Sequence, residues 1–190
     1  MTQEVTQEVT QTGDLAATLD RLIRDVPDFP KPGVMFKDVT PLLADPAGFA
    51  TVVAALANAG RDASGDAAVD VVVGMEARGF IFGAPVALAL QRGFVPVRKP
   101  GKLPAETHSL SYDLEYGSET LEMHVDAIVR GQRVLIVDDV LATGGTAKAT
   151  VDLVREAGGT VHGVAVLMEL SFLPGRATLG DVPLTALRTV

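Results

Sequence analysis

One stretch decides the fold, Val134-Leu135-Ile136-Val137-Asp138-Asp139-Val140-Leu141-Ala142-Thr143-Gly144-Gly145-Thr146. Its first four residues are apolar and three of them are β-branched, which predicts a strand buried on both faces, as in a parallel sheet with helices on either side. A helical pattern follows, with Ala147, Val151 and Val154 on one side and Gly158-Gly159 as its stop. This order of strand, turn and helix predicts an α/β unit.

The turn at residues 142–146 has the composition of an anion site. Its glycines allow a tight turn and a close approach to a ligand, and free N–H groups and hydroxyls at a helix N-terminus bind phosphate. Because carboxylates repel phosphate, Asp138 and Asp139 are expected to face ribose hydroxyls or a magnesium ion. The stretch has neither a Walker ending nor the dinucleotide glycine spacing. It predicts a site for a phosphorylated sugar; the alternative is an ordinary strand, Asp-rich turn and helix cap.

A second strand and turn repeat this arrangement. Residues 69–73 read Val-Asp-Val-Val-Val and run into Gly74-Met75-Glu76-Ala77-Arg78-Gly79, with an apolar helix to about Leu90. Arg78 stands among glycines at the carboxyl end of a strand, where a guanidinium can bind phosphate through two N–H groups. This predicts an anion clamp; the alternative is a surface turn with a solvated arginine.

The remaining elements indicate one open, mostly parallel sheet, because strands and helices alternate along the chain. Further strands are predicted at 94–98 and 160–167, with an edge strand near 182–187, and helices at 15–23 and 48–59. Two short alternating segments around Tyr116-Gly117-Ser118 predict a hairpin of the length of an active-site lid, or else a solvated flap. The Pro- and Gly-rich residues 28–41 predict an ordered loop, with Phe29 in the core and Phe36 either there or stacked on an aromatic base.

Composition limits the function classes. The chain has 190 residues, a net charge of −8 and no cysteine, which suits one domain in a reducing cytosol. No basic run offers a nucleic-acid surface, and no apolar stretch reaches the ~18 residues of a membrane helix. Residues 1–13 repeat Thr-Gln-Glu-Val and predict a disordered tail without the pattern of a signal peptide.

The strand, acid pair and Ala-Thr-Gly-Gly-Thr turn resemble the phosphoribosyl-pyrophosphate signature of type I phosphoribosyltransferases. Four more segments are similar to the adenine phosphoribosyltransferase family. These segments are Asp-Phe-Pro-x-Pro-Gly-Val-x-Phe-Lys-Asp at 28–38, Gly-x-Glu-Ala-Arg-Gly-Phe at 74–80, Arg-Lys-x-Gly-Lys-Leu-Pro at 98–104 and Tyr-x-Leu-Glu-Tyr-Gly at 112–117. The resemblance covers about residues 15–185.

The resemblance implies the type I phosphoribosyltransferase fold, an α/β fold with a mostly parallel central sheet flanked by helices. It implies a single domain over residues 14–190, with a small N-terminal hood from 14–41 and a flexible lid loop. The implied reaction transfers phosphoribosyl from 5-phosphoribosyl 1-pyrophosphate to adenine and gives AMP and pyrophosphate, with Mg²⁺ as cofactor. The implied enzyme is a cytoplasmic homodimer of purine salvage that binds neither nucleic acid nor membrane.

The resemblance also implies the roles of individual residues. Catalysis is assigned to Glu115, Arg78, Asp138 and Asp139. That Glu115 handles the purine proton is a hypothesis from its place in the predicted lid. Magnesium has no direct protein ligand and is expected through substrate oxygens and water near Asp138 and Asp139. Substrate binding is assigned to Met35, Phe36, Lys37, Glu76, Ala77, Arg78, Lys99, Lys102, Tyr116, Asp138, Asp139, Ala142, Thr143, Gly144, Gly145 and Thr146.

Three other functions stay open at this point. The same fold serves regulators that bind phosphoribosyl pyrophosphate without catalysis, although the acidic composition gives such a protein no nucleic-acid surface. An enzyme for another purine, such as xanthine, would share the sugar-phosphate signature. The third is a nucleotide-binding structural module, which needs neither the lid nor Arg78.

Overall fold

The computed structural model describes residues 15–113 and 118–190. The chain divides into two compact units, residues 1–55 and 56–190. The predicted tail at 1–13 and the lid residues Glu115 and Tyr116 lie outside the described residues. In the described part of the chain, no helix has the length and apolar character needed to cross a membrane.

A five-stranded parallel sheet forms the centre of the larger unit. Its strands lie in the order β4 (Gly93–Val97), β3 (Val71–Met75), β7 (Arg133–Leu141), β8 (Thr160–Glu169) and β9 (Leu184–Thr189). The central strands are runs of buried β-branched residues, as a sheet covered on both faces requires. The predicted parallel sheet is therefore confirmed, including its short edge strand.

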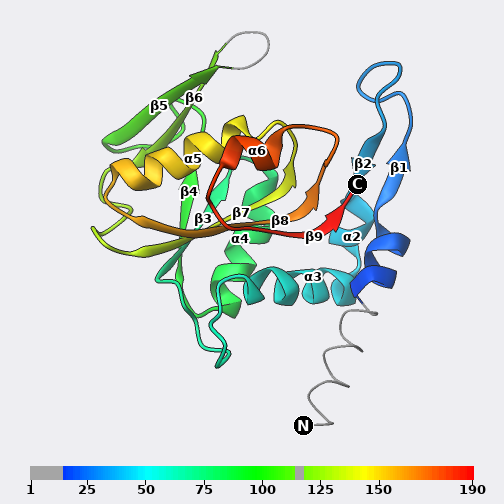
Figure 1. Ribbon diagram of the computed structural model, residues 1–190, viewed down its shortest axis with the longest axis horizontal. Helices are drawn as coiled ribbons and strands as arrows, with labels where there is room; N and C mark the ends of the chain where they lie inside the picture. Colours follow the sequence, from blue (N-terminus) through cyan, green and yellow to red (C-terminus); the bar gives the residue numbers. More distant parts are fainter. Residues whose placement is uncertain (1–14, 114–117) are drawn as a thin grey trace. The chain divides into compact units, whose positions relative to one another are not determined.

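Three helices connect these strands, and they explain why both faces of the sheet are buried. Helix α4 (Arg78–Ala89) follows β3 and leads to β4, whereas α5 (Gly145–Glu156) and α6 (Gly175–Leu179) follow β7 and β8 and lead in the opposite direction. Because such crossovers are right-handed, α4 covers one face and the other two helices cover the opposite face. Figure 1 shows α5 and α6 together on one side of the sheet.

Strand β7 is longer than the sequence predicted. The apolar run ends at Val137, but the strand continues to Leu141 because β8 runs alongside it, pairing Asp138 with Val166 and Leu141 with Glu169. Asp138 and Asp139 therefore lie within the strand, where backbone pairing holds them in place.

The predicted hairpin is present as β5 (Thr107–Asp113) and β6 (Ser118–His124), paired antiparallel. Leu121 and Met123 on β6 are buried in the core of the larger unit. A bridge between Arg98 and Glu122 joins the hairpin to the segment after β4. These contacts anchor the base of the hairpin to the sheet.

The smaller unit contains elements that the sequence did not predict. Residues 15–22 are helical as expected, but β1 (Arg24–Val26) and β2 (Phe36–Asp38) form an antiparallel ribbon, followed by α2 (Thr40–Ala44). Helix α3 (Pro46–Asn58) then crosses the boundary between the units. A three-residue strand is too short to show a period-2 pattern, which explains why β1 was not predicted and why β2 was expected to be part of an ordered loop.

Charge pairs across the ribbon stabilise it. Arg24 and Asp38 are cross-strand partners that form an ion pair, and Lys37 Nζ lies 2.7 Å from Asp25 Oδ1 in the next pair. The prediction that Phe29 fills the core is wrong, because its side chain is 50% exposed. Phe29 instead sets its ring against that of Phe36, with 5.0 Å between the ring centroids.

Candidate functional site

The candidate site of the larger unit lies at the switch point of its sheet. Strands β3 and β7 are neighbours, but the connections that follow them lead in opposite directions. In open α/β sheets this arrangement leaves a crevice at the carboxyl ends of the two strands, where ligands bind. Residues 76–78 follow β3 and residues 142–146 follow β7, so the two predicted anion-binding segments lie at the carboxyl ends of these neighbouring strands.

Residues 142–146 form a pocket of about 90 Å³ at the start of α5. Gly144 has φ +86°, and a Cβ there would lie 2.8 Å from the Gly175 carbonyl oxygen, so only glycine fits. The Thr178 hydroxyl donates to the Thr143 carbonyl at 2.8 Å and ties the loop to α6. The pocket is lined by Asp138, Val140, Leu141, Ala142, Thr143, Gly144, Gly145, Thr146 and Ala147. A concave loop with N–H groups at a helix N-terminus has the properties of a phosphate site.

The two acids of β7 have different surroundings. Asp139 is buried, and its Oδ2 lies 2.7 Å from Arg78 Nε. Asp138 lines the pocket, and its Oδ1 accepts a hydrogen bond from the Asp139 N–H at 2.9 Å. Burial raises the pKa of Asp138 well above its usual value, and the neighbouring carboxylate of Asp139 raises it further. Asp138 therefore ionises less readily than an exposed aspartate does.

Arg78 is the first residue of α4, forms an ion pair with Asp139 and also acts electrostatically on Asp138. Its ion pair with the buried Asp139 distinguishes it from a solvated arginine on a surface turn. The side chain is still 46% exposed, so the guanidinium is accessible from solvent while it compensates a buried charge. Ala77 precedes it, joined to Glu76 by a cis peptide bond. The structure thus brings Arg78 together with Asp139, which follows Asp138 in β7.

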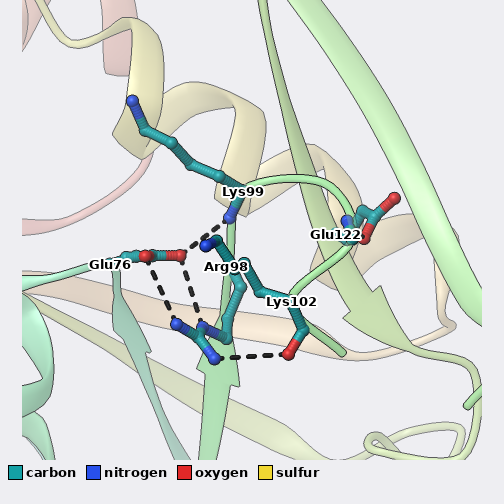
Figure 2. A network of polar contacts seen from close by, with 6 residues as sticks. Glu76, Arg98, Lys99, Lys102 and Glu122 are labelled. Carbon is teal, nitrogen blue, oxygen red and sulfur yellow. Dashed lines mark hydrogen bonds and ion pairs between the residues drawn. The ribbon is translucent and has the colours of Figure 1, made fainter. Parts of the chain in front are cut away.

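Glu76 holds the loop of residues 98–102, called the basic loop because it carries Arg98, Lys99 and Lys102 (Figure 2). Its carboxylate accepts hydrogen bonds from Arg98 Nε and Nη2, both at 3.3 Å, and from the Lys99 backbone N–H at 3.0 Å. The Lys99 N–H and the Arg98 guanidinium hold the pKa of Glu76 below its usual value. Arg98 also donates to the Lys102 carbonyl at 3.2 Å, and Glu122 accepts from the Gly101 N–H at 3.0 Å. These contacts fix the loop that carries both predicted lysines, Lys99 and Lys102.

The Lys99 side chain points away from Glu76 in Figure 2. Its Nζ lies 3.1 Å from Glu119 on β6, which also accepts from the Tyr112 hydroxyl on β5. Sequence reasoning missed Tyr112 and Glu119. The alternation of the hairpin could have indicated that they are cross-strand partners. Nothing local indicated that the Tyr112 hydroxyl lies 3.0 Å from Thr146 in the loop of residues 142–146, which is called the anion loop below.

Met35, Phe36 and Lys37 belong to the smaller unit. Met35 is 54% exposed, and the Phe36 ring is only partly buried, edge-on to Phe29. The Lys37 side chain is paired with Asp25. This segment therefore presents apolar side chains of the kind that can receive a flat aromatic ligand.

Acidic and histidine side chains do not gather into a dedicated metal site within residues 15–113 and 118–190. That part of the chain contains no group of three or more His, Cys, Asp or Glu residues able to hold a metal ion. The nearest approach to such a group at the crevice is the pair Asp138 and Asp139. Two carboxylates suit a magnesium ion that takes its other ligands from water and from a substrate.

Comparison with known proteins identifies the family. The model of the phosphoribosyl transferase domain matches residues 38–174. The adenine phosphoribosyltransferase of a Nocardioides species is 68% identical over 169 residues, which cover 89% of this chain and 91% of that protein. That of Thermobifida fusca is 60% identical over 177 residues, covering 93% of this chain and 98% of the relative.

Solved structures agree with the sequence comparison. The adenine phosphoribosyltransferase of Thermoanaerobacter pseudethanolicus superposes with a TM-score of 0.85 at 50% identity, over 93% of this chain and 99% of that one. The enzyme from Saccharomyces cerevisiae, solved with an imino-altritol bisphosphate and adenine, gives a TM-score of 0.87 at 40% identity, over 92% and 99% of the two chains. The chain therefore belongs to the adenine phosphoribosyltransferases, within the type I phosphoribosyltransferase family.

Proposed function

We propose that this chain carries out the reaction of its family with the residues described above. The reaction transfers phosphoribosyl from 5-phosphoribosyl 1-pyrophosphate to adenine and gives AMP and pyrophosphate. The observation that carries the residue assignment is the phosphate-sized pocket of residues 142–146, which shares the crevice with the Arg78–Asp139 ion pair.

The anion loop is assigned to the 5-phosphate. Backbone N–H groups at the start of α5 and the hydroxyls of Thr143 and Thr146 are donors that suit phosphate oxygens. Asp138 and Asp139 are assigned to the ribose hydroxyls, because a carboxylate accepts the hydrogen bonds that hydroxyls donate. Hydrogen-bond donors are thereby assigned to the phosphate of the sugar phosphate, and hydrogen-bond acceptors to its ribose hydroxyls.

The pyrophosphate is assigned to residues 76–78 and to the basic loop. Arg78 supplies a guanidinium beside the crevice, and Lys99 and Lys102 come from the loop that Glu76 holds in place. Since the whole chain carries a net charge of −8, these few placed cations must attract the substrate locally. Glu76 supports the site through Arg98 and the Lys99 N–H.

The donor set at the crevice fits magnesium bound mainly through substrate oxygens. Asp138 and Asp139 would hold the ion through water or ribose oxygens, because two carboxylates are too few for an all-protein cage. When bound, magnesium neutralises charge on the pyrophosphate and makes it a better leaving group. Arg78 and the lysines contribute positive charge to the same leaving group, while the acids stabilise the positive charge that develops on the ribose carbon.

Adenine is assigned to residues 35–37, with Phe36 stacking on the base. The backbone of Met35 and Lys37 is assigned to base recognition, since a carbonyl accepts from the exocyclic amine and an N–H donates to a ring nitrogen. The pairing of the Lys37 side chain with Asp25 supports a backbone role for this residue. A 6-oxo purine would place acceptor against acceptor and leave a buried polar group unpaired.

Glu115 and Tyr116 keep their assignments as predictions, because they lie outside the described residues. Glu115 is assigned to proton handling at the purine and Tyr116 to substrate binding. Replacing the carboxylate in Glu115→Gln is expected to lower turnover by more than about tenfold. Turnover within a few-fold of the parent would remove Glu115 from the mechanism.

The proposal is tested by incubating the chain with phosphoribosyl pyrophosphate, magnesium and each purine base in turn. Of the purine bases, only adenine should yield nucleotide and pyrophosphate. Product with xanthine or hypoxanthine at a comparable rate would contradict the base assignment, and binding of phosphoribosyl pyrophosphate without product would indicate a regulator. We also propose that the chain is a homodimer, which the family resemblance supports and which sedimentation would measure. The proposed location is the cytosol, which the cysteine-free composition suits.

A further inference from the structure

Four side chains from separate segments of the larger unit form one hydrogen-bonded chain. Lys99 Nζ lies 3.1 Å from Glu119 Oε1, and the Tyr112 hydroxyl donates to Glu119 Oε2 at 3.0 Å. The same Tyr112 oxygen lies 3.0 Å from the Thr146 hydroxyl. The chain thus connects the basic loop, both strands of the hairpin and the anion loop.

Backbone geometry holds Tyr112 in this position. Tyr112 and Glu119 are direct cross-strand partners in the β5–β6 hairpin. The ring lies against the anion loop, because a Cβ on Gly145 would come within 3.2 Å of two of its carbon atoms. Tyr112 is also partly buried, which raises the pKa of its hydroxyl and keeps it protonated. The hydroxyl therefore has one proton to donate and a fixed pair of neighbours.

The charge of Glu119 decides which group donates in each hydrogen bond of this chain. Hydrogen bonds from Lys99 and Tyr112 hold the pKa of Glu119 below its usual value, so the carboxylate is ionised at neutral pH. An ionised carboxylate only accepts, so Tyr112 gives its single proton to Glu119. The contact between Tyr112 and Thr146 then requires that Thr146 donates its proton to the Tyr112 oxygen.

This direction opposes anion binding at two places. Thr146 lines the phosphate pocket, but a hydroxyl that donates to Tyr112 presents only lone pairs to a phosphate oxygen. Lys99 is held on Glu119 at the same time, and a pyrophosphate must compete with this carboxylate for its charge. One acidic residue thus withholds a donor from each end of the sugar substrate.

We propose that Glu119 is a positioning residue that lowers the affinity of the site for its anionic ligands, by directing the Thr146 hydroxyl through Tyr112 and by holding Lys99. The inference rests on the proposed function, since it assigns the 5-phosphate to the anion loop and the pyrophosphate to the basic loop. Binding of substrate requires the hydrogen direction to reverse at Thr146 and the Lys99–Glu119 pair to open.

Two conservative variants separate the two parts of the proposal, which are the direction of the Thr146 hydroxyl and the pairing of Lys99. In Glu119→Gln the amide can donate to the Tyr112 oxygen, which frees Tyr112 to donate to Thr146 and Thr146 to donate to phosphate, while Lys99 loses its ionic partner. AMP and pyrophosphate should each bind about three- to tenfold more tightly. In Tyr112→Phe the ring stays but the hydroxyl is lost, so AMP alone should bind more tightly and pyrophosphate should be unchanged.

Thr120→Val is the matched control, because it removes the hydroxyl of the neighbouring cross-strand pair, Ser111 and Thr120, 2.8 Å apart. Calorimetric binding of AMP and pyrophosphate to the parent and the three variants is the experiment, with KM for adenine expected to stay constant. A parent that binds neither ligand contradicts the proposed function itself. With a parent that binds both ligands, AMP affinity that is unchanged or weaker in Glu119→Gln or in Tyr112→Phe overturns the role of Glu119. Pyrophosphate affinity that is unchanged or weaker in Glu119→Gln overturns it as well.

Discussion

Arg78 Nε lies 2.7 Å from Asp139 Oδ2, and this ion pair joins the two segments that flank the switch point of the sheet. Arg78 opens the helix after β3, whereas Asp139 lies inside β7 and is buried. A buried carboxylate without a cation is strongly unfavourable, so Arg78 compensates Asp139 in addition to any contact with a ligand. The pair gives the crevice a fixed arrangement of charge before a substrate arrives.

Replacement of this arginine should act mainly on the leaving group. In Arg78→Ala the guanidinium assigned to pyrophosphate is lost, and pyrophosphate binding should weaken by more than about tenfold. AMP, which carries no pyrophosphate, should bind within about threefold of the parent affinity. Calorimetry with the two ligands measures this difference. Equal losses for both would show that Arg78 serves only to hold Asp139.

The anion loop should tolerate no side chain at Gly144. Alanine there combines a left-handed backbone with a Cβ only 2.8 Å from the Gly175 carbonyl oxygen, so AMP affinity should fall by more than tenfold, a change of about 1.4 kcal/mol or more. Gly131→Ala is the matched control, because φ there is +87° but a Cβ would meet no atom within 4 Å. It should cost about 1 kcal/mol of stability and leave AMP binding intact. Similar AMP affinity in both variants would contradict the loop assignment.

Base binding should depend on the aromatic ring at residue 36. Phe36→Ala is expected to raise KM for adenine about three- to tenfold, the range for loss of one aromatic stacking contact, with KM for phosphoribosyl pyrophosphate unchanged. Phe172→Ala removes another ring, 73% exposed in the larger unit, and should change neither constant. Steady-state kinetics on both variants make the comparison. An unaltered adenine KM in Phe36→Ala would place the base elsewhere.

Acid should weaken the contact between Asp70, which immediately precedes β3, and Arg133, the first residue of β7. Asp70 accepts from the Arg133 backbone N–H at 2.8 Å and from its Nη2 at 2.9 Å. These bonds, led by those from the guanidinium, lower the pKa of Asp70 from 3.8 to about 2. Because the folded-state pKa is the lower one, the stabilisation is complete above pH 3.8 and is lost as the pH falls towards 2.

Both side chains of this pair are partly exposed, so the contribution is below about 1 kcal/mol. Urea unfolding at pH 7 should show Asp70→Asn less stable than the parent by such an amount, and the difference should vanish near pH 2. Asp181→Asn, at an exposed aspartate, is the control and should match the parent at both pH values. A difference that persists unchanged at pH 2 would contradict the assignment to the ionised form.

The parts of the structure predicted from sequence are those with a local signal. Strands β3 and β7 each contain a short run of mostly β-branched residues, and the glycine turn and Arg78 lie close to them in the chain. The β1–β2 ribbon has no such signal, since its strands are three residues long and depend on cross-strand charge pairs such as Arg24 with Asp38. Secondary structure that tertiary contacts stabilise cannot be predicted from periodicity alone.

The same distinction applies to the site. Residues 142–146 and the acid pair were predicted because one short stretch carries them. The contacts that orient the basic loop and the anion loop join residues far apart in the sequence, with a separation of 22 from Glu76 to Arg98 and of 34 from Tyr112 to Thr146. Only the folded chain brings these polar partners together, and so Glu119 and Tyr112 were missed.

A crystal structure of the chain with AMP tests the central claim most directly. The phosphate is expected in the pocket of residues 142–146, within hydrogen-bonding distance of the N–H groups at the start of α5, with the ribose hydroxyls at Asp138 and Asp139. A nucleotide bound with its phosphate anywhere else, and this pocket filled only by water, would contradict the account.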